Sequence, residues 1–244
     1  MSASHDESIL HGDSKYLVRF QDYLGEFVYG GIDGSITTFA VVAGATGADL
    51  SSAIVLILGF ANIFADGFAM SIGAYLATRS AQHNYDKHKT VEYWEVDNLP
   101  DVERQEIREI YQKKGFDGEL LEQIVEVICS DRDRWVDVMM KDELHMIRER
   151  RSAIAIGATT FASFILVGLI PLAIYVWDYL FDFEGDLFFT ACLLTSIAFI
   201  IVGFLKSFVT QTNKIKGVLE TLLLGAAAAS VAYYVGYFLD YIIN

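Results

Sequence analysis

The sequence predicts an all-α membrane protein with five transmembrane helices per subunit and a cytosolic three-helix insert between spans 2 and 3. Hydrophobic residues make up 53% of its 244 residues and the mean hydropathy is +0.36, which is unusually apolar for a soluble domain. No Lys or Arg occurs between Arg19 and Arg79, between Arg151 and Lys206, or after Lys216. Because a bilayer span needs about 20 mostly apolar residues, these gaps accommodate two spans, two spans and one.

The N-terminal region, 1–26, is polar and acidic up to Asp13, so we expect no cleavable signal peptide. The segment 16–26 alternates apolar, aromatic and charged side chains at helical spacing. This pattern predicts a short helix in the membrane interface before the first span. A polar tail that runs directly into the span is the alternative.

Short polar segments divide the cation-free gaps into single spans. Residues 46–49 separate the first two spans, and the acidic segment 175–186 separates the third from the fourth. The predicted spans are 27–44, 52–78, 153–175, 187–205 and 218–242. The predicted domains are 1–26, 27–79 with spans 1 and 2, the insert 80–151, and 152–244 with spans 3 to 5.

The distribution of Lys and Arg also predicts the orientation of the chain. All 18 cations lie on one side of the predicted spans, in the N-terminus, the insert and the loop 206–216. Cytosolic loops are enriched in Lys and Arg. We therefore expect these three regions in the cytosol and the C-terminus outside.

The insert differs sharply in composition from the spans, because it is rich in Glu, Asp, Lys and Arg. Turn signals at 98–101 and 115–118 divide it into three predicted helices, 81–96, 102–114 and 119–151. Nothing between the second span and the first of these helices breaks a helix, so we expect one continuous helix there.

Ionisable residues within a span are costly and rare, so each is a candidate for function. Asp33 lies in the first span, and Glu26 lies two turns earlier. In the second span Asn62, Asp66 and Met70 follow one another at intervals of four and share a face. Carboxylate, amide and thioether ligands suit a divalent transition metal, and poorly solvated carboxylates also exchange protons. The alternatives are an interfacial Glu26, inter-helix hydrogen bonds of the two aspartates, and core packing of the methionine.

Carboxylates at spacings of three recur in the insert, accompanied by two adjacent methionines. By spacing alone, a solvated helical face with ion pairs to Arg104, Arg108 and Lys113, and methionines in the core, is the favoured interpretation. Metal binding is the less favoured one. The candidate metal ligands are Glu92, Glu95, Glu103, Glu106, Met139, Met140 and Glu143.

Composition also argues against several other functions. The formal net charge of −14 gives no support to nucleic-acid binding. Two cysteines, Cys129 and Cys192, are too few for a disulfide framework or a Cys-based zinc site. No organic cofactor is expected.

Three segments together resemble the vacuolar iron transporter family, and the resemblance covers residues 15–244. They are GIDG at 31–34 with TTFA at 37–40, FAMSIGAYLA at 68–77, and VMMKDEL at 138–144. The resemblance implies a homodimer of five-span subunits that exports Fe²⁺ from the cytosol in exchange for protons. Mn²⁺, Co²⁺ and Zn²⁺ are further candidate substrates.

The resemblance also implies roles for particular residues. Glu26, Asp33 and Met70 would line the membrane pathway, and the insert would bind metal through the candidate ligands named above. Plant members carry a glutamate at the position of Asn62. Either Asp66, one turn further along, takes its place, or the pathway of this chain has lost one proton acceptor.

Two other classes of function remain open from the sequence. A membrane-anchored di-iron oxidase or ferritin-like store needs Glu-x-x-His pairs, and none of the five histidines follows a glutamate by three. A metal sensor without transport has no need of carboxylates within its spans. The short loops favour a bacterial plasma membrane, and a eukaryotic chain would belong in the vacuolar membrane.

Overall fold

The computed structural model describes the backbone of residues 15–243 and the side chains of residues 22–243. This described part is helical and contains no strand. It divides into two compact units, which we call the membrane unit (to Tyr75, and from Arg151 onward) and the insert unit (Leu76–Arg150). The helix α3 (Ser52–Asn98) is continuous and supplies residues to both units, as the sequence predicts.

The membrane unit contains four helices that are long and apolar enough to cross a bilayer. They are α2 (Lys15–Gly47), the first part of α3, α9 (Leu187–Thr210) and α10 (Lys214–Ile243). The helices α7 (Ala153–Gly168) and α8 (Ala173–Phe181) would make a fifth span if the bent pair crosses the bilayer as one. The all-α membrane class is therefore confirmed, with four or five candidate spans among the described residues.

The third predicted span, 153–175, is not one straight helix. Helix α7 ends at Gly168, and α8 leaves at an angle of 54° after a break of a few residues. Pro171 lies in this break. A proline lacks the N–H that an α-helix needs and disfavours the helical conformation of the preceding residue, which explains the bend.

The predicted separate helix at 16–26 is also corrected. Helix α2 runs without interruption from Lys15 to Gly47, so the amphipathic segment forms its first turns. No proline occurs in this stretch to interrupt the helix.

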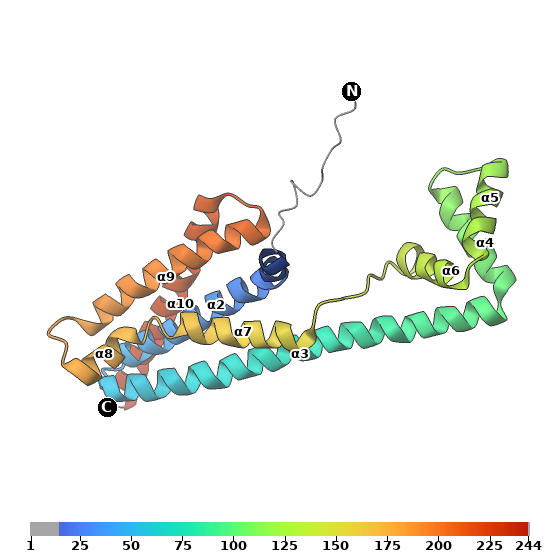
Figure 1. Ribbon diagram of the computed structural model, residues 1–244. Helices are drawn as coiled ribbons and strands as arrows, with labels where there is room; N and C mark the ends of the chain where they lie inside the picture. The colour runs from blue at the N-terminus through green and yellow to red at the C-terminus, as the bar shows by residue number, and fades with distance from the viewer. Residues whose placement is uncertain (1–14, 244) are drawn as a thin grey trace, which may run out of the picture. The chain divides into compact units, whose positions relative to one another are not determined.

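Helix α2 lies at the centre of the membrane unit, between α7 on one side and α9 and α10 on the other (Figure 1). Glycines allow this close approach. A methyl group on Gly34 would overlap the backbone of Phe164 in α7, and one on Gly47 would overlap the backbone of Tyr233 in α10. Small residues at crossing points are the usual means by which membrane helices pack closely.

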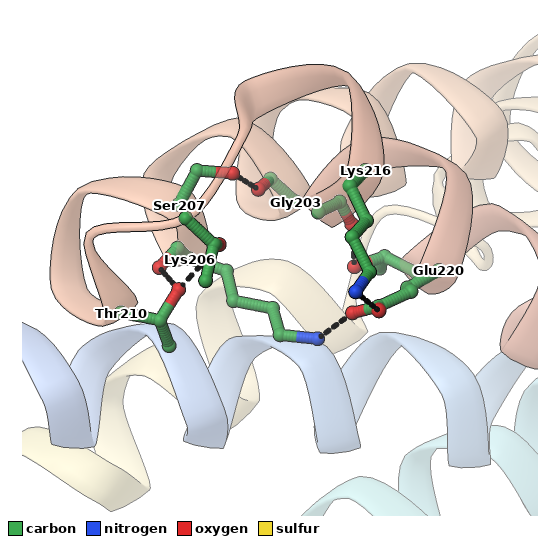
Figure 2. Close-up of polar contacts among 9 residues, drawn as sticks. Gly203, Lys206, Ser207, Thr210, Lys216 and Glu220 are labelled. Atoms are coloured by element: carbon green, nitrogen blue, oxygen red, sulfur yellow. Dashed lines mark hydrogen bonds and ion pairs between the residues drawn. The ribbon is translucent and has the colours of Figure 1, made fainter.

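One ion pair joins α9 to α10 beside the turn between them, and a second lies within α10, as Figure 2 shows. The ammonium group of Lys206 lies 3.1 Å from one carboxylate oxygen of Glu220, and that of Lys216 lies 4.0 Å from the other. Behind these pairs the Ser207 hydroxyl donates to the Gly203 carbonyl, where the two helices pack closely. The turn and its flanks thus carry three lysines, Lys206, Lys214 and Lys216, and one acidic residue, Glu220.

The two ends of the membrane unit differ in charge. Figure 1 shows the α9–α10 turn at the same end as the beginnings of α2 and α7, with the α2–α3 turn, the α8–α9 turn and the end of α10 at the other. Arg151 and the lysines of the α9–α10 turn lie at the first end. The acidic residues Asp49, Asp182, Glu184, Asp186 and Asp240 lie at the second.

The insert unit is a small helical bundle with its own apolar core. It comprises the end of α3, α4 (Pro100–Lys113), α5 (Gly118–Cys129), α6 (Arg132–Val138) and a π-helical turn, η1 (Met139–Glu143). Ile107, Val125 and Val136 are among the buried side chains at its centre.

The predicted third insert helix, 119–151, is wrong beyond its first part. Helix α5 ends at Cys129, and a new helix, α6, begins at Arg132. The Asp131 side chain accepts a hydrogen bond from the backbone N–H of Arg134 and caps α6. After η1, residues 144–152 form no regular helix before α7 begins.

Candidate functional site

The polar residues of α2 and α3 come together in the membrane unit. The Asp33 and Asp66 carboxylates lie close enough to repel each other. The side-chain amide of Asn62 donates a hydrogen bond to Asp66 Oδ2 at 2.9 Å. The stripe that the sequence places on one face of α3 therefore faces the acidic residue of α2.

These carboxylates lie at the surface of the membrane unit. Asp33 and Asp66 are exposed, and Asn62 is half-buried. Next to them on α3, three alanines four residues apart are also exposed: Ala61, Ala65 and Ala69. The polar cluster and the alanine stripe thus share one uncovered face.

A cavity of about 440 Å³ lies one helical turn away from the two aspartates, toward the lysine end. Helix α2 contributes Glu26 and Tyr29 to its wall, and α3 contributes Met70. Since Met70 follows Asp66 by four residues and Tyr29 precedes Asp33 by four, the aspartate pair lies one helical turn beyond the cavity along both helices.

The carboxylate of Glu26 is paired with Arg151 in this cavity. Arg151 Nη1 donates to Glu26 Oε1 at 2.7 Å and to the backbone carbonyl of Asp22 at 3.1 Å. The other carboxylate oxygen, Glu26 Oε2, is buried and has no hydrogen-bond partner. Glu26 is therefore a partly neutralised carboxylate with one oxygen still available.

In the insert unit, three elements contribute glutamates that influence one another electrostatically. Glu92 and Glu103 are each only 4% exposed, and one carboxylate oxygen of each is buried without a hydrogen-bond partner. The cluster, which we call the insert glutamates, consists of Glu92 and Glu95 from α3, Glu103 and Glu106 from α4, and Glu143 from η1.

Burial and mutual repulsion oppose ionisation of these carboxylates. Burial, and secondarily the charges of Glu143, Glu95 and Glu106, raise the pKa of Glu92 from 4.5 to about 7. Burial, and then the charge of Glu106 and its neighbours, raise the pKa of Glu103 to about 8. The pKa values of Glu106 and Glu143 are raised as well, chiefly by burial. Such a site holds protons near neutral pH unless a cation replaces them.

No lysine or arginine within the described part of the chain forms an ion pair with any insert glutamate. Arg108, a partner that the sequence offered, instead makes two hydrogen bonds to Glu122, at 2.7 and 2.8 Å. The interpretation of these residues as ordinary surface ion pairs therefore fails for the buried members, Glu92 and Glu103.

Across residues 22–243, no three His, Cys, Asp or Glu side chains already converge as a chelating group. Met139 and Met140 are fully buried in the apolar core of the insert unit. The same π-helical turn carries Glu143 at its end. π-Helical turns occur often at functional sites, and this one links the core methionines to the insert glutamates.

Sequence reasoning missed Arg151 and Tyr29 as members of the membrane cavity. Arg151 is separated from Glu26 by 125 positions, so no local spacing could connect them. Its place as the last cation before a long cation-free stretch was the only signal. Tyr29 is one of many aromatic residues in the spans, and nothing in its surroundings distinguishes it.

Comparison with known proteins identifies the family of this chain. The sequence profile described as the VIT family matches residues 24–237. The vacuolar iron transporter of Toxoplasma gondii is 34% identical over 96% of this chain and 81% of its own. Vacuolar iron transporter 1 of Tulipa gesneriana is 30% identical over 93% and 91%, respectively, and the vacuolar iron transporter of Plasmodium falciparum is 31% identical over 93% and 85%. The family resemblance of the sequence motifs is thereby confirmed, and the chain belongs to the VIT family.

Proposed function

We propose that this protein is a secondary transporter that exports Fe²⁺ from the cytosol in exchange for protons, with Mn²⁺, Co²⁺ or Zn²⁺ as possible further substrates. The observation that carries the proposal is the meeting of Asp33, Asp66 and Asn62 from two apolar helices. The names of the relatives support iron as the substrate and a transporter rather than an enzyme.

The charges at the two ends of the membrane unit support an orientation. The lysine end, with Arg151 and the α9–α10 turn of Figure 2, would face the cytosol under the positive-inside rule. The acidic turns would face the opposite compartment. The cavity beside Glu26 then lies at the cytosolic end of the pathway, and the aspartate pair lies further in.

The pathway would run from this cavity to the aspartate pair. A divalent ion cannot cross hydrocarbon without compensating charge, and two adjacent carboxylates supply it. Met70 lies between the cavity and Asp66 and offers a thioether, which favours softer transition metals over magnesium and calcium. Asn62 adds a neutral amide to the same stripe of α3.

A second copy of the chain would complete the pathway as a homodimer. Carboxylates facing lipid are expensive, yet Asp33 and Asp66 are exposed in one membrane unit. The adjacent stripe of Ala61, Ala65 and Ala69 suits close packing of a second helix. Covering this face with the same face of another copy would remove the aspartates from lipid.

Proton exchange follows from the closeness of the two aspartates. When the metal ion leaves, both carboxylates cannot easily remain ionised side by side in a poorly solvated site. At least one would take a proton from the outer side and release it inward when the next ion arrives. The insert glutamates would capture metal in the cytosol, drawn together by the ion that they bind.

The test is transport by purified protein in proteoliposomes, with Fe²⁺ uptake and internal pH followed together. Asp33→Asn should abolish metal flux and metal-driven proton movement at once, and Asp66→Asn should do the same. Asp49→Asn, an exposed acid in the α2–α3 turn, is the matched control and should transport normally. Full transport by Asp33→Asn would refute the mechanism.

A further inference from the structure

We propose that Arg151 is a tethered counter-cation: its guanidinium occupies Glu26 while the pathway is empty, and a metal ion must displace it to enter. This proposal rests on the transport function proposed above. It adds a selection step at the entrance that the family resemblance does not assign.

The contact has the geometry of an occupied cation site. One guanidinium nitrogen of Arg151 bridges the carboxylate of Glu26 and the carbonyl of Asp22. Both are oxygen acceptors of the kind that a divalent ion also takes. The Glu26 side chain is 18% exposed, and its second oxygen is buried without a hydrogen-bond partner. Arg151 thus satisfies only one oxygen of the carboxylate, which makes it a displaceable partner.

The cavity makes the two cations competitors. Glu26, Asp22, Met70 and Arg151 all line the same cavity of about 440 Å³. A divalent ion on Glu26 would lie beside the guanidinium, where repulsion between a double and a single positive charge is strong in partly desolvated surroundings. Occupation of Glu26 by metal and by Arg151 is therefore mutually exclusive.

The backbone around Arg151 holds the guanidinium within reach of this position. The next residue, Ser152, donates its backbone N–H to the Tyr23 hydroxyl at 3.3 Å, and its side chain caps the start of α7. The Cα of Arg151 is thereby fixed against α2, whereas its long side chain can swing away and return.

The need to displace the Arg151 guanidinium favours divalent over monovalent ions. A monovalent ion brings no more charge than the guanidinium and cannot match its directed hydrogen bonds to two acceptors. A divalent ion brings twice the charge to the same carboxylate. Because arginine remains protonated at all physiological pH values, this competitor does not disappear when the pH changes.

The experiment measures initial transport rates of Mn²⁺, a stable probe, against concentration in proteoliposomes. Arg151→Gln keeps a polar, shorter side chain that can still donate a hydrogen bond, and it removes the charge. We expect its half-saturating Mn²⁺ concentration to fall about 5- to 10-fold, within the usual range of coupling between sites. Inhibition by K⁺, weak in the wild type, should become measurable. Arg148→Gln, which removes an arginine paired with Asp86, is the matched control and should behave as wild type.

A double-mutant cycle makes the assignment specific. In a Glu26→Gln background, Arg151→Gln should cause no further change in half-saturation, because the contested carboxylate is gone. The proposal is overturned if folded Arg151→Gln keeps the half-saturating Mn²⁺ concentration of wild type, or if this variant loses transport. It is also overturned if Arg151→Gln has the same effect with Glu26 and with Gln at position 26. If Arg151→Gln does not fold, Arg151→Lys provides the test. Because lysine retains the charge, we expect a half-saturating Mn²⁺ concentration within about twofold of that of wild type, and a larger change would overturn the proposal.

The two proposals fail separately. Transport by Asp33→Asn would refute the transport pathway itself. An inactive Asp33→Asn together with an unaltered Arg151→Gln would leave the pathway in place and remove only the counter-cation.

Discussion

Glu92 and Glu103 are buried carboxylates that form no ion pair with the described part of the chain, and one oxygen of each has no hydrogen-bond partner there. An isolated buried charge is unstable, so such groups either keep a proton or bind a positive ion. Their pKa values of about 7 and about 8 place this choice near neutral pH. Proton and metal binding at the insert should therefore be linked.

Metal affinity of the insert should rise with pH. Burial raises the pKa of Glu92 to about 7 and that of Glu103 to about 8, so both carboxyl groups must lose protons to become ligands. We expect Mn²⁺ affinity to increase between about pH 6 and about pH 8.5, with proton release on binding near pH 7. Calorimetry of the full chain in two buffers of different ionisation enthalpy measures both. Binding without proton release would show that these glutamates are not the ligands.

Glu103→Gln should have opposite effects on the empty and the metal-bound insert. Between the ordinary pKa of 4.5 and about 8, the folded chain keeps a proton that the unfolded chain has lost, so stability falls as pH rises through this window. Gln cannot ionise. The metal-free variant should therefore be more stable than wild type at pH 8, and Mn²⁺ affinity should fall at least about tenfold.

Amide hydrogen exchange of α4 in the full chain reports the local stability of this variant. Glu122→Gln is the matched control on the neighbouring helix, since Glu122 is exposed and bound to Arg108. It should change neither Mn²⁺ affinity nor the pH dependence. If the two variants had the same Mn²⁺ affinity and the same pH dependence, the insert glutamates would be an ordinary solvated helical face rather than metal ligands.

At the scale of helices, the packing of α2 against α7 depends on the absence of a side chain at Gly34. A methyl group there would meet backbone atoms of Phe164, which cannot move aside as a flexible side chain would. Gly34→Ala should destabilise the membrane unit by about 1–3 kcal/mol, the usual cost of overpacking. Thermal unfolding in detergent, followed by size-exclusion chromatography, measures the loss.

Gly25→Ala provides the control for this prediction. Gly25 lies in the same helix, and the nearest atom to an added methyl group would be Val209 Cγ1 at 3.9 Å, an ordinary contact. Its stability should equal or exceed that of wild type, because alanine favours helix by about 1 kcal/mol over glycine. Equal destabilisation of both variants would mean that the α2–α7 crossing does not control stability.

The sequence predicted those elements whose signals are local and uninterrupted. The continuous α3 follows from the absence of a helix breaker over 52–98, and the cation-free gaps located the apolar helices. The bend at Pro171 was missed because average hydropathy does not register a single proline. The break at Asp131 carried a readable capping signal, whereas the π-helical turn after Val138 depends on tertiary packing.

The candidate site was predictable in its residue types and less so in its partners. Spacing on α3 correctly placed Asn62 and Asp66 together. Spacing could not tell that Glu92 and Glu103 point inward, because inward and solvated faces of a charged helix have the same period. The pair of Glu26 and Arg151 joins distant parts of the chain, which only the fold brings together.

At the scale of the whole molecule, exposed Asp33 of α2, exposed Asp66 of α3 and the alanine stripe of α3 would be costly facing lipid, so we expect a partner to cover them. Four-residue spacing places Ala61, Ala65 and Ala69 on one stripe, where a second helix can approach closely. Ala65→Leu should push two such helices apart. We expect this variant to shift from dimer to monomer in detergent and to lose transport, because the aspartate pair would no longer be shielded.

Ala227→Leu is the matched control, since Ala227 is an exposed alanine on another helix, α10. The same added volume should leave both mass and transport unchanged. Native mass spectrometry gives the subunit number directly, and proteoliposome flux gives the activity. A dimeric, active Ala65→Leu would place the subunit contact elsewhere. A monomeric but active Ala65→Leu would show that each subunit carries a complete pathway, with Asp33 and Asp66 shielded by other means.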